Sequence, residues 1–164
     1  MLNTLKDFFT LEMIYHFTNI GVIPLWILLA FLPGWSGTKV LINSILAPLI
    51  LGLTYFYVFY IYINTSEGIF SNILDKGKIF ELYMGIDQLK KSFSDKNVLL
   101  LFWIHFLTAN LILGAWIAID AAKNKALQFI VLVPLILTYF AGPIGLGFYL
   151  ILRLLAAQKF KLFD

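Results

Sequence analysis

Long runs of apolar residues follow one another along the chain, separated by polar segments, and four of them are long enough to form membrane-spanning helices. A helix needs about 20 residues, each rising about 1.5 Å, to cross a hydrocarbon core about 30 Å thick. We predict spans at residues 15–32, 40–63, 98–119 and 127–152. The first contains Pro24, which membrane helices tolerate, and the fourth is broken near Gly142 and Pro143. The pattern predicts an all-α fold, a four-helix transmembrane bundle forming a single membrane domain over residues 1–164.

Between the second and third predicted spans, residues 69–93 mix charged and apolar residues at helical spacing. The apolar residues fall on one helix face: Ile79, Leu82, Tyr83, Ile86, Leu89 and Phe93. Most of the charged residues fall on the other face, so we predict an amphipathic helix lying in the membrane interface. Just after it, Ser94 and Asp95 stand where they can cap the first turn of the third span.

The composition agrees with a membrane protein and excludes several classes of site. Apolar residues make up 61% and charged residues 13%, about half the usual charged share, so lipid must cover part of the surface. The absence of cysteine rules out disulfides, thiolate metal sites and cysteine nucleophiles. The net charge of +3 comes without a basic cluster, so we expect no nucleic acid partner. Scattered His and carboxylate residues give no ligand set, so we expect no metal and no cofactor.

Positive residues predict an orientation in the membrane. With four spans, the N-terminus, the segment between spans two and three and the C-terminal tail share one side, which carries nine of the twelve Lys and Arg residues. The other side carries Lys39, Lys123 and Lys125. Because positive residues collect on the cytoplasmic side, we predict an inner (cytoplasmic) membrane protein with both termini cytoplasmic. The Lys-, Asn- and Ile-rich usage favours a bacterial source.

The third span carries the polar residues of greatest interest, His105, Asn110 and Asp120. At about 100° per residue, with His105 at zero, Asp120 falls at about 60° and Asn110 at about 140°. We therefore expect this half of the helix to face its neighbours and not lipid. The three side chains either form interhelical hydrogen bonds that fix packing or make a proton-handling site, because His exchanges protons near neutral pH.

The end of the second span is rich in aromatic residues: Tyr55, Phe56, Tyr57, Phe59, Tyr60 and Tyr62. Tyrosines at a helix end usually anchor it at the membrane interface. The alternative is a flat aromatic wall for a conjugated ligand.

The order and spacing of several residues resemble a known family. In the third span they are Trp103, His105, Asn110, Leu111, Gly114, Trp116 and Asp120. The segment 85–93 precedes them, and the closing residues are Gly142, Pro143, Gly145, Tyr149 and Arg153. With Asn19, Pro24, Trp26 and Pro33 in the first span, these features resemble the abscisic acid-deficient-four-like family, whose plant members are linked to neoxanthin synthesis.

The resemblance implies a four-helix membrane protein of carotenoid and xanthophyll metabolism. In plants the family is required for converting violaxanthin to neoxanthin, an isomerisation in which an epoxide opens to an allenic alcohol. Such a step needs a proton donor and a base, and we expect His105 and Asp120 to be catalytic. The residues expected to bind substrate are Asn110, Trp103, Trp116, Tyr55, Tyr149 and Arg153.

One residue departs from the family pattern. Asn110 stands where the family usually has Asp, and an amide cannot exchange protons as a carboxyl group does. Two functions therefore stay open: a cofactor-free carotenoid isomerase or epoxide-rearranging enzyme, and a non-catalytic carotenoid- or lipid-binding subunit of a larger membrane complex. A transporter fits least, because paired internal repeats are missing. The expected partners are membrane lipid, a carotenoid or other polyene, and a second copy of the chain or a larger complex.

Overall fold

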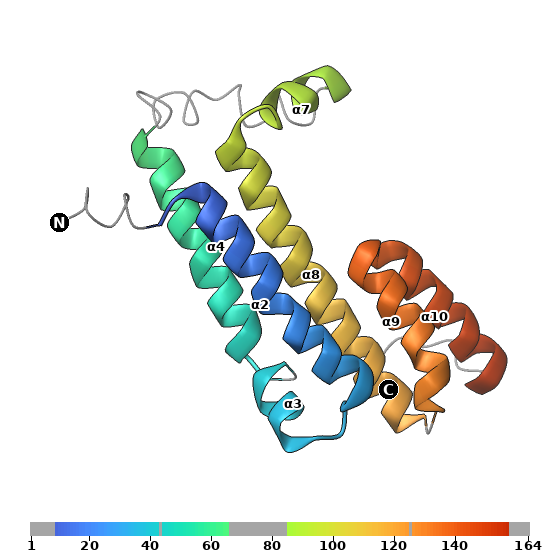
Figure 1. Ribbon diagram of the computed structural model, residues 1–164. Coiled ribbons are helices and arrows are strands. Elements are labelled where there is room, and N and C mark those ends of the chain that lie inside the picture. The colour runs from blue at the N-terminus through green and yellow to red at the C-terminus, as the bar shows by residue number, and fades with distance from the viewer. Residues whose placement is uncertain (1–8, 43, 66–84, 125, 158–164) are drawn as a thin grey trace. The chain divides into compact units, whose positions relative to one another are not determined.

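The computed structural model describes residues 9–42, 44–65, 85–124 and 126–157, and all regular structure within them is helical (Figure 1). The helices are α2 (Leu11–Phe31), α3 (Ser36–Leu41), α4 (Leu46–Thr65), α7 (Ile86–Ser92), α8 (Lys96–Lys123), α9 (Gln128–Phe140) and α10 (Gly142–Ala157). The all-α prediction is confirmed for these residues. The chain divides into two compact units, one comprising Met1–Thr18 and Leu51–Phe106 and the other Asn19–Ile50 and Leu107–Asp164. We call them unit 1 and unit 2.

Three helical stretches in the described part of the chain are long and apolar enough to cross a membrane: Leu11–Phe31, Ser36–Ile63 and Lys96–Lys123. They overlap the first three predicted spans, although the second stretch combines α3 and α4, which are separate helices among the described residues. Helix α2 passes through Pro24 without interruption and ends just before Pro33. The Thr38 hydroxyl, fully buried, donates a 2.7 Å hydrogen bond to the carbonyl of Leu32, the residue after α2, which also accepts the Trp35 N–H at 3.1 Å.

The fourth predicted span is not one continuous helix. Ala141 has φ −150° and ψ 78°, outside the helical region, and separates α9 from α10. With 13 and 16 residues, the two helices are about 20 and 24 Å long, shorter than the hydrocarbon core. The predicted break near Gly142 is confirmed, so residues 127–152 form two helices instead of one, and their crossing of the membrane stays a prediction. Pro143 favours the break, because its ring would clash with the carbonyl four residues earlier in a continuous helix, but proline alone does not require one, since α2 contains Pro24 and α9 contains Pro134.

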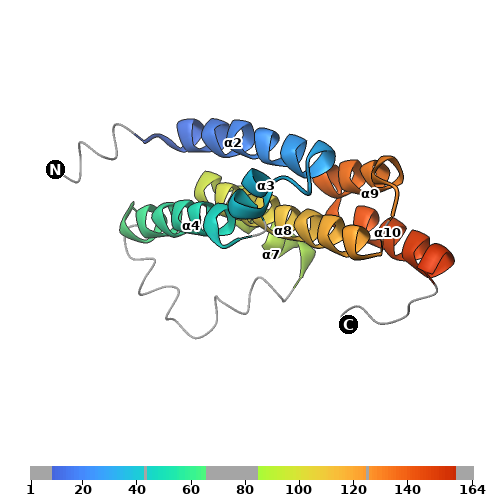
Figure 2. The ribbon, with the colours of Figure 1, turned by 90° about the horizontal axis from the view of Figure 1, so that it is seen from below.

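Helices α9 and α10 lie side by side, as both views show (Figures 1 and 2). They come very close to one another at Gly145. A Cβ atom added there would collide with the hydroxyl and backbone nitrogen of Thr138 and would lie 2.6 Å from the Pro134 carbonyl oxygen. The fully buried Thr138 hydroxyl donates a 2.7 Å hydrogen bond to that carbonyl. The two backbones therefore touch at a point where only glycine fits.

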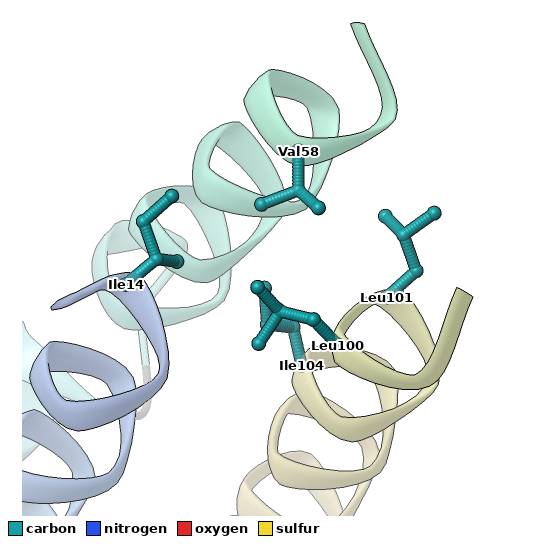
Figure 3. Close-up of a cluster of buried hydrophobic side chains, with 5 residues drawn as sticks. All are labelled: Ile14, Val58, Leu100, Leu101 and Ile104. Atoms are coloured by element: carbon teal, nitrogen blue, oxygen red, sulfur yellow. The ribbon is translucent and has the colours of Figure 1, made fainter. Parts of the chain in front are cut away.

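Unit 1 is held by a small apolar core (Figure 3). Ile14 of α2, Val58 of α4 and three residues of α8 point into it: Leu100, Leu101 and Ile104. Leu11, Tyr57 and Tyr62 pack against this core. The aromatic end of α4 is thus divided, because Tyr57 and Tyr62 pack inward while Tyr55, Phe56, Phe59 and Tyr60 are exposed.

The predicted interfacial helix over 69–93 is described only in its last part, α7, and residues 69–84 lie outside the described residues. No α7 residue is buried, and Phe93, just after α7, packs edge-to-face on Phe102 at 4.9 Å. The predicted Asp95 cap is confirmed, since its Oδ1 accepts hydrogen bonds from the backbone N–H groups of Asn97 at 2.7 Å and Val98 at 3.4 Å. Ser94 does not cap α8; its hydroxyl donates to the Lys90 carbonyl.

Candidate functional site: a buried Asp–Arg–Tyr cluster

Unit 2 contains a cluster of three buried polar side chains from two helices. Asp120 lies in the last turn of α8, while Tyr149 and Arg153 lie on α10. Because Tyr149 and Arg153 are four residues apart, they fall on the same face of α10. The three residues are only 9%, 4% and 5% exposed, respectively. We call them the Asp120 cluster.

The polar groups around Asp120 all contact its carboxylate. The Arg153 Nε atom lies 2.8 Å from Asp120 Oδ2 in an ion pair, and Arg153 Nη2 donates a hydrogen bond to Oδ1 at 3.2 Å. The Tyr149 hydroxyl donates to Oδ2 at 2.6 Å. The amide of Asn124 donates to Oδ2 at 3.2 Å. Both carboxylate oxygens are therefore engaged, and the cluster ties the end of α8 to α10.

The chemistry of this arrangement follows from its charges. Guanidinium and carboxylate balance one another, and this balance is what makes burying the two charges tolerable, since an unpaired buried ion costs several kcal/mol. Tyr149 adds a hydroxyl proton next to an anionic base. A short hydrogen bond between a proton donor and a carboxylate is the arrangement that general acid–base chemistry uses.

Trp116 forms the partly exposed edge of the cluster. Its ring lies 5.8 Å from the Tyr149 ring with an interplanar angle of 88°, an edge-to-face contact that aromatic pairs favour. Trp116 is one helical turn before Asp120 on α8 and is half-buried.

Asn110 lies elsewhere on α8, against the start of α10. The residue is only 5% exposed. Its Nδ2 atom has no hydrogen-bond partner among the described residues. Its Oδ1 atom fills the place where a Cβ atom at Gly142 would stand, with Cγ 3.0 Å from that place. Asn110 therefore lies directly against the start of α10, and a Cβ atom at 142 would require its side chain to move.

His105 is not where we expected it. Its side chain is exposed, so the prediction that it faces neighbouring helices is wrong, whereas Asn110 and Asp120 are buried as expected. The buried apolar residues of α8, such as Leu107 and Leu111, fall at about 200–240° from His105 by the 100° rule. The helix face that packs is centred on these residues, and His105 lies nearly opposite. Its catalytic role stays a prediction.

Two other predicted site residues belong to unit 1. Trp103 stacks on Phe106 at 5.4 Å and contacts the Tyr15 ring at 6.2 Å, and Tyr55 is exposed. The structure thus brings four predicted residues together in unit 2: Asp120, Trp116, Tyr149 and Arg153. Their assignment as catalytic or substrate-binding remains a prediction, as it does for Asn110, Trp103 and Tyr55.

Sequence reasoning missed Asn124, which hydrogen-bonds the Asp120 carboxylate. A signal was present, because residues four apart on a helix are neighbours.

Within residues 9–42, 44–65, 85–124 and 126–157, no group of three or more His, Asp or Glu side chains is placed to hold a metal ion.

Comparison with known proteins gives one match. The sequence model of the family described as ABA DEFICIENT 4-like matches residues 13–149, which include the Asp120–Tyr149 pair of the cluster. No curated protein and no solved structure matches the chain. Several apolar helices and this family assignment agree with a membrane protein related to carotenoids and xanthophylls. Because the match covers most of its length, the chain belongs to the ABA DEFICIENT 4-like family.

Proposed function

We propose that this protein rearranges an oxygenated carotenoid in the membrane, with the Asp120 cluster as its acid–base site. The observation that carries the proposal is the 2.6 Å hydrogen bond from the Tyr149 hydroxyl to the Asp120 carboxylate, beside the Arg153 guanidinium. Family membership supplies the substrate class. The half-buried Trp116 ring supports the same reading, since aromatic rings pack well on a flat polyene.

The reaction supported is the opening of an epoxide to an allenic alcohol. One carbon–oxygen bond of the epoxide breaks, the adjoining chain carbon loses its proton, and its electron pair forms the new carbon–carbon double bond. The oxygen takes up one proton, so atoms balance and no electrons are gained or lost. Tyr149 gives its proton to the oxygen, and Asp120 takes the carbon proton.

The same cluster restores itself after the step. Asp120 then carries a proton and Tyr149 lacks one, and the hydrogen bond that joins them is the path by which the proton returns. Arg153 stays charged throughout, because a guanidinium does not lose its proton in proteins, and it compensates the anion on whichever partner carries it.

A second function is favoured by Asn110. The amide stands where the family usually has a carboxyl group and cannot exchange a proton. If the chemistry of the family needs that carboxyl, this chain binds a carotenoid without altering it, and the ion pair between Asp120 and Arg153 only fixes α10 to α8.

Expression in a carotenoid-producing bacterium distinguishes the two functions. Pigments are extracted from the membranes and from the purified protein and separated by chromatography. Conversion that is lost in Tyr149→Phe and kept in Phe148→Leu, an exposed neighbour on α10, supports the acid–base site. Pigment that co-purifies unaltered supports the binding subunit. Conversion that survives in Tyr149→Phe and is lost in His105→Ala would move the chemistry to His105.

A further inference from the structure

Two contacts fix the direction of α10 relative to α8, both inside unit 2. Asn110 of α8 meets Gly142, the first residue of α10. Ten residues later on α8, Asp120 meets Tyr149 and Arg153, which lie seven and eleven residues further along α10. Because the contacts follow the same order on both helices at matching spacing, α10 runs parallel to the C-terminal half of α8. Helix α9, which joins the end of α8 to the start of α10, therefore runs antiparallel to both.

The lengths agree with this path. From Asn110 to Lys123, where α8 ends, the helix rises about 20 Å, and the 13 residues of α9 also rise about 20 Å. Helix α8 has 28 residues and a length of about 42 Å. The turn at Ala141 thus lies near the middle of α8, so α9 runs back along the C-terminal half of α8 and α10 runs forward beside it.

We infer that α9 and α10 form a re-entrant hairpin, which enters the membrane at the face where α8 ends, turns at mid-depth beside Asn110 and returns the C-terminus and the Asp120 cluster to that same face. The chain then crosses the membrane three times, with its termini on opposite sides. One consequence rests on the proposed function: the polar end group of the polyene reaches the Asp120 cluster at the membrane face that carries the C-terminus.

Part of the turn meets the main physical requirement for a re-entrant segment, although Ala141, which leaves the helical path, is only half-buried. Backbone that leaves the helical path at membrane depth is tolerated only where protein covers it. Gly142 is buried under the Asn110 side chain, and α9 and α10 touch backbone to backbone at Gly145. Inside α9, the Thr138 hydroxyl gives the Pro134 carbonyl an additional hydrogen bond.

The hairpin also changes the charge argument. With three crossings, the tail residues Arg153, Lys159 and Lys161 move to the side of Lys39, Lys123 and Lys125, and each side carries six of the twelve Lys and Arg residues. With three crossings the two termini cannot both be cytoplasmic, and the positive-inside rule favours neither orientation because the charge is evenly divided.

The chain has no cysteine, so single cysteines report their side of the membrane directly. The variants are Asn3→Cys near the N-terminus, Lys123→Cys at the end of α8, Phe140→Cys near the turn and Lys161→Cys in the tail. Each is expressed in bacteria and treated with a membrane-impermeant maleimide before and after the inner membrane is opened.

We expect Lys123→Cys and Lys161→Cys to label from one face, Asn3→Cys to label only from the other, and Phe140→Cys to label only after detergent is added. Labelling of Asn3→Cys and Lys161→Cys from the same face would overturn the inference, and so would labelling of Phe140→Cys from the face opposite Lys123→Cys. Pigment is not part of the readout, so failure of the proposed function and failure of the hairpin are separate results.

Discussion

Single residues in the Asp120 cluster have unequal effects when removed, because two of them are charged. Asp120→Asn leaves the Arg153 guanidinium buried without its counter-charge, and we expect a loss of about 3–5 kcal/mol in the free energy of unfolding. The double variant Asp120→Asn/Arg153→Gln removes both charges and should regain most of that loss. Unfolding of the purified variants in detergent measures both values. A double variant no more stable than Asp120→Asn would show that the two side chains are not coupled.

Tyr149→Phe separates the hydroxyl from the ring. The ring contact with Trp116 is kept, and the lost hydrogen bond to a charged acceptor should cost about 1.5–3 kcal/mol. Loss of a general acid lowers a rate by about 10²–10⁴-fold, so conversion of pigment should fall far more than the amount of folded protein. Both are measured on the same membranes, by pigment chromatography and by immunoblot. A fall in conversion no larger than the fall in protein would assign Tyr149 a structural role.

The residues of this cluster were accessible from the sequence one by one but not as a group. Asp120, Tyr149 and Arg153 stand out as polar groups in or beside apolar runs, where each needs a partner. Their meeting depends on α10 running parallel to α8, which no local pattern encodes. The prediction for His105 is wrong for a related reason: the buried apolar residues define the packed face of α8, and a polar residue within an apolar run does not have to lie on it.

At the scale of elements, the contact between α9 and α10 depends on one glycine. In Gly145→Ala the added carbon meets the backbone of α9 at Thr138 and Pro134, which cannot move aside as a flexible side chain does. We expect the free energy of unfolding to fall by about 1–3 kcal/mol. Gly147→Ala is the matched control on the same helix, since nothing lies within 4 Å of its added carbon, and it should be neutral or gain up to about 1 kcal/mol from helix propensity. Thermal unfolding in detergent compares the two, and equal midpoints would contradict the close approach.

The elements themselves follow from the sequence to different degrees. Long uncharged runs identify α2 and α8 within a few residues, because only length and apolarity are needed to cross a bilayer. The Asp95 cap can also be predicted from the sequence, because it depends only on residues two and three positions further along the chain. The fourth run also shows its break, at a Gly-Pro pair, but a proline signals only where a helix stops. Whether the chain continues onward or folds back depends on contacts such as Gly145 with Thr138, which are invisible in the pattern.

For the whole molecule, the three crossings that the re-entrant hairpin gives would divide the Lys and Arg residues evenly, so the orientation should be easy to reverse. The double variant Lys90→Gln/Lys91→Gln leaves four positive residues on the side of the N-terminus against six. Lys39→Gln/Lys123→Gln leaves six against four. All four lysines are exposed, so folding should be little affected. We expect the two variants to insert in opposite orientations, with the side that keeps six positive residues in the cytoplasm.

Maleimide labelling of an added Asn3→Cys in each variant reads this orientation. With a four-span topology the counts would be seven against three in the first variant and nine against one in the second, so both would keep the N-terminus in the cytoplasm. Identical labelling of the two variants would therefore contradict the re-entrant hairpin. Opposite labelling would mean that the two variants hold the Asp120 cluster at opposite faces of the membrane and differ only in the positions of their positive residues. Pigment conversion in the two orientations would then report from which face the end group of the substrate arrives.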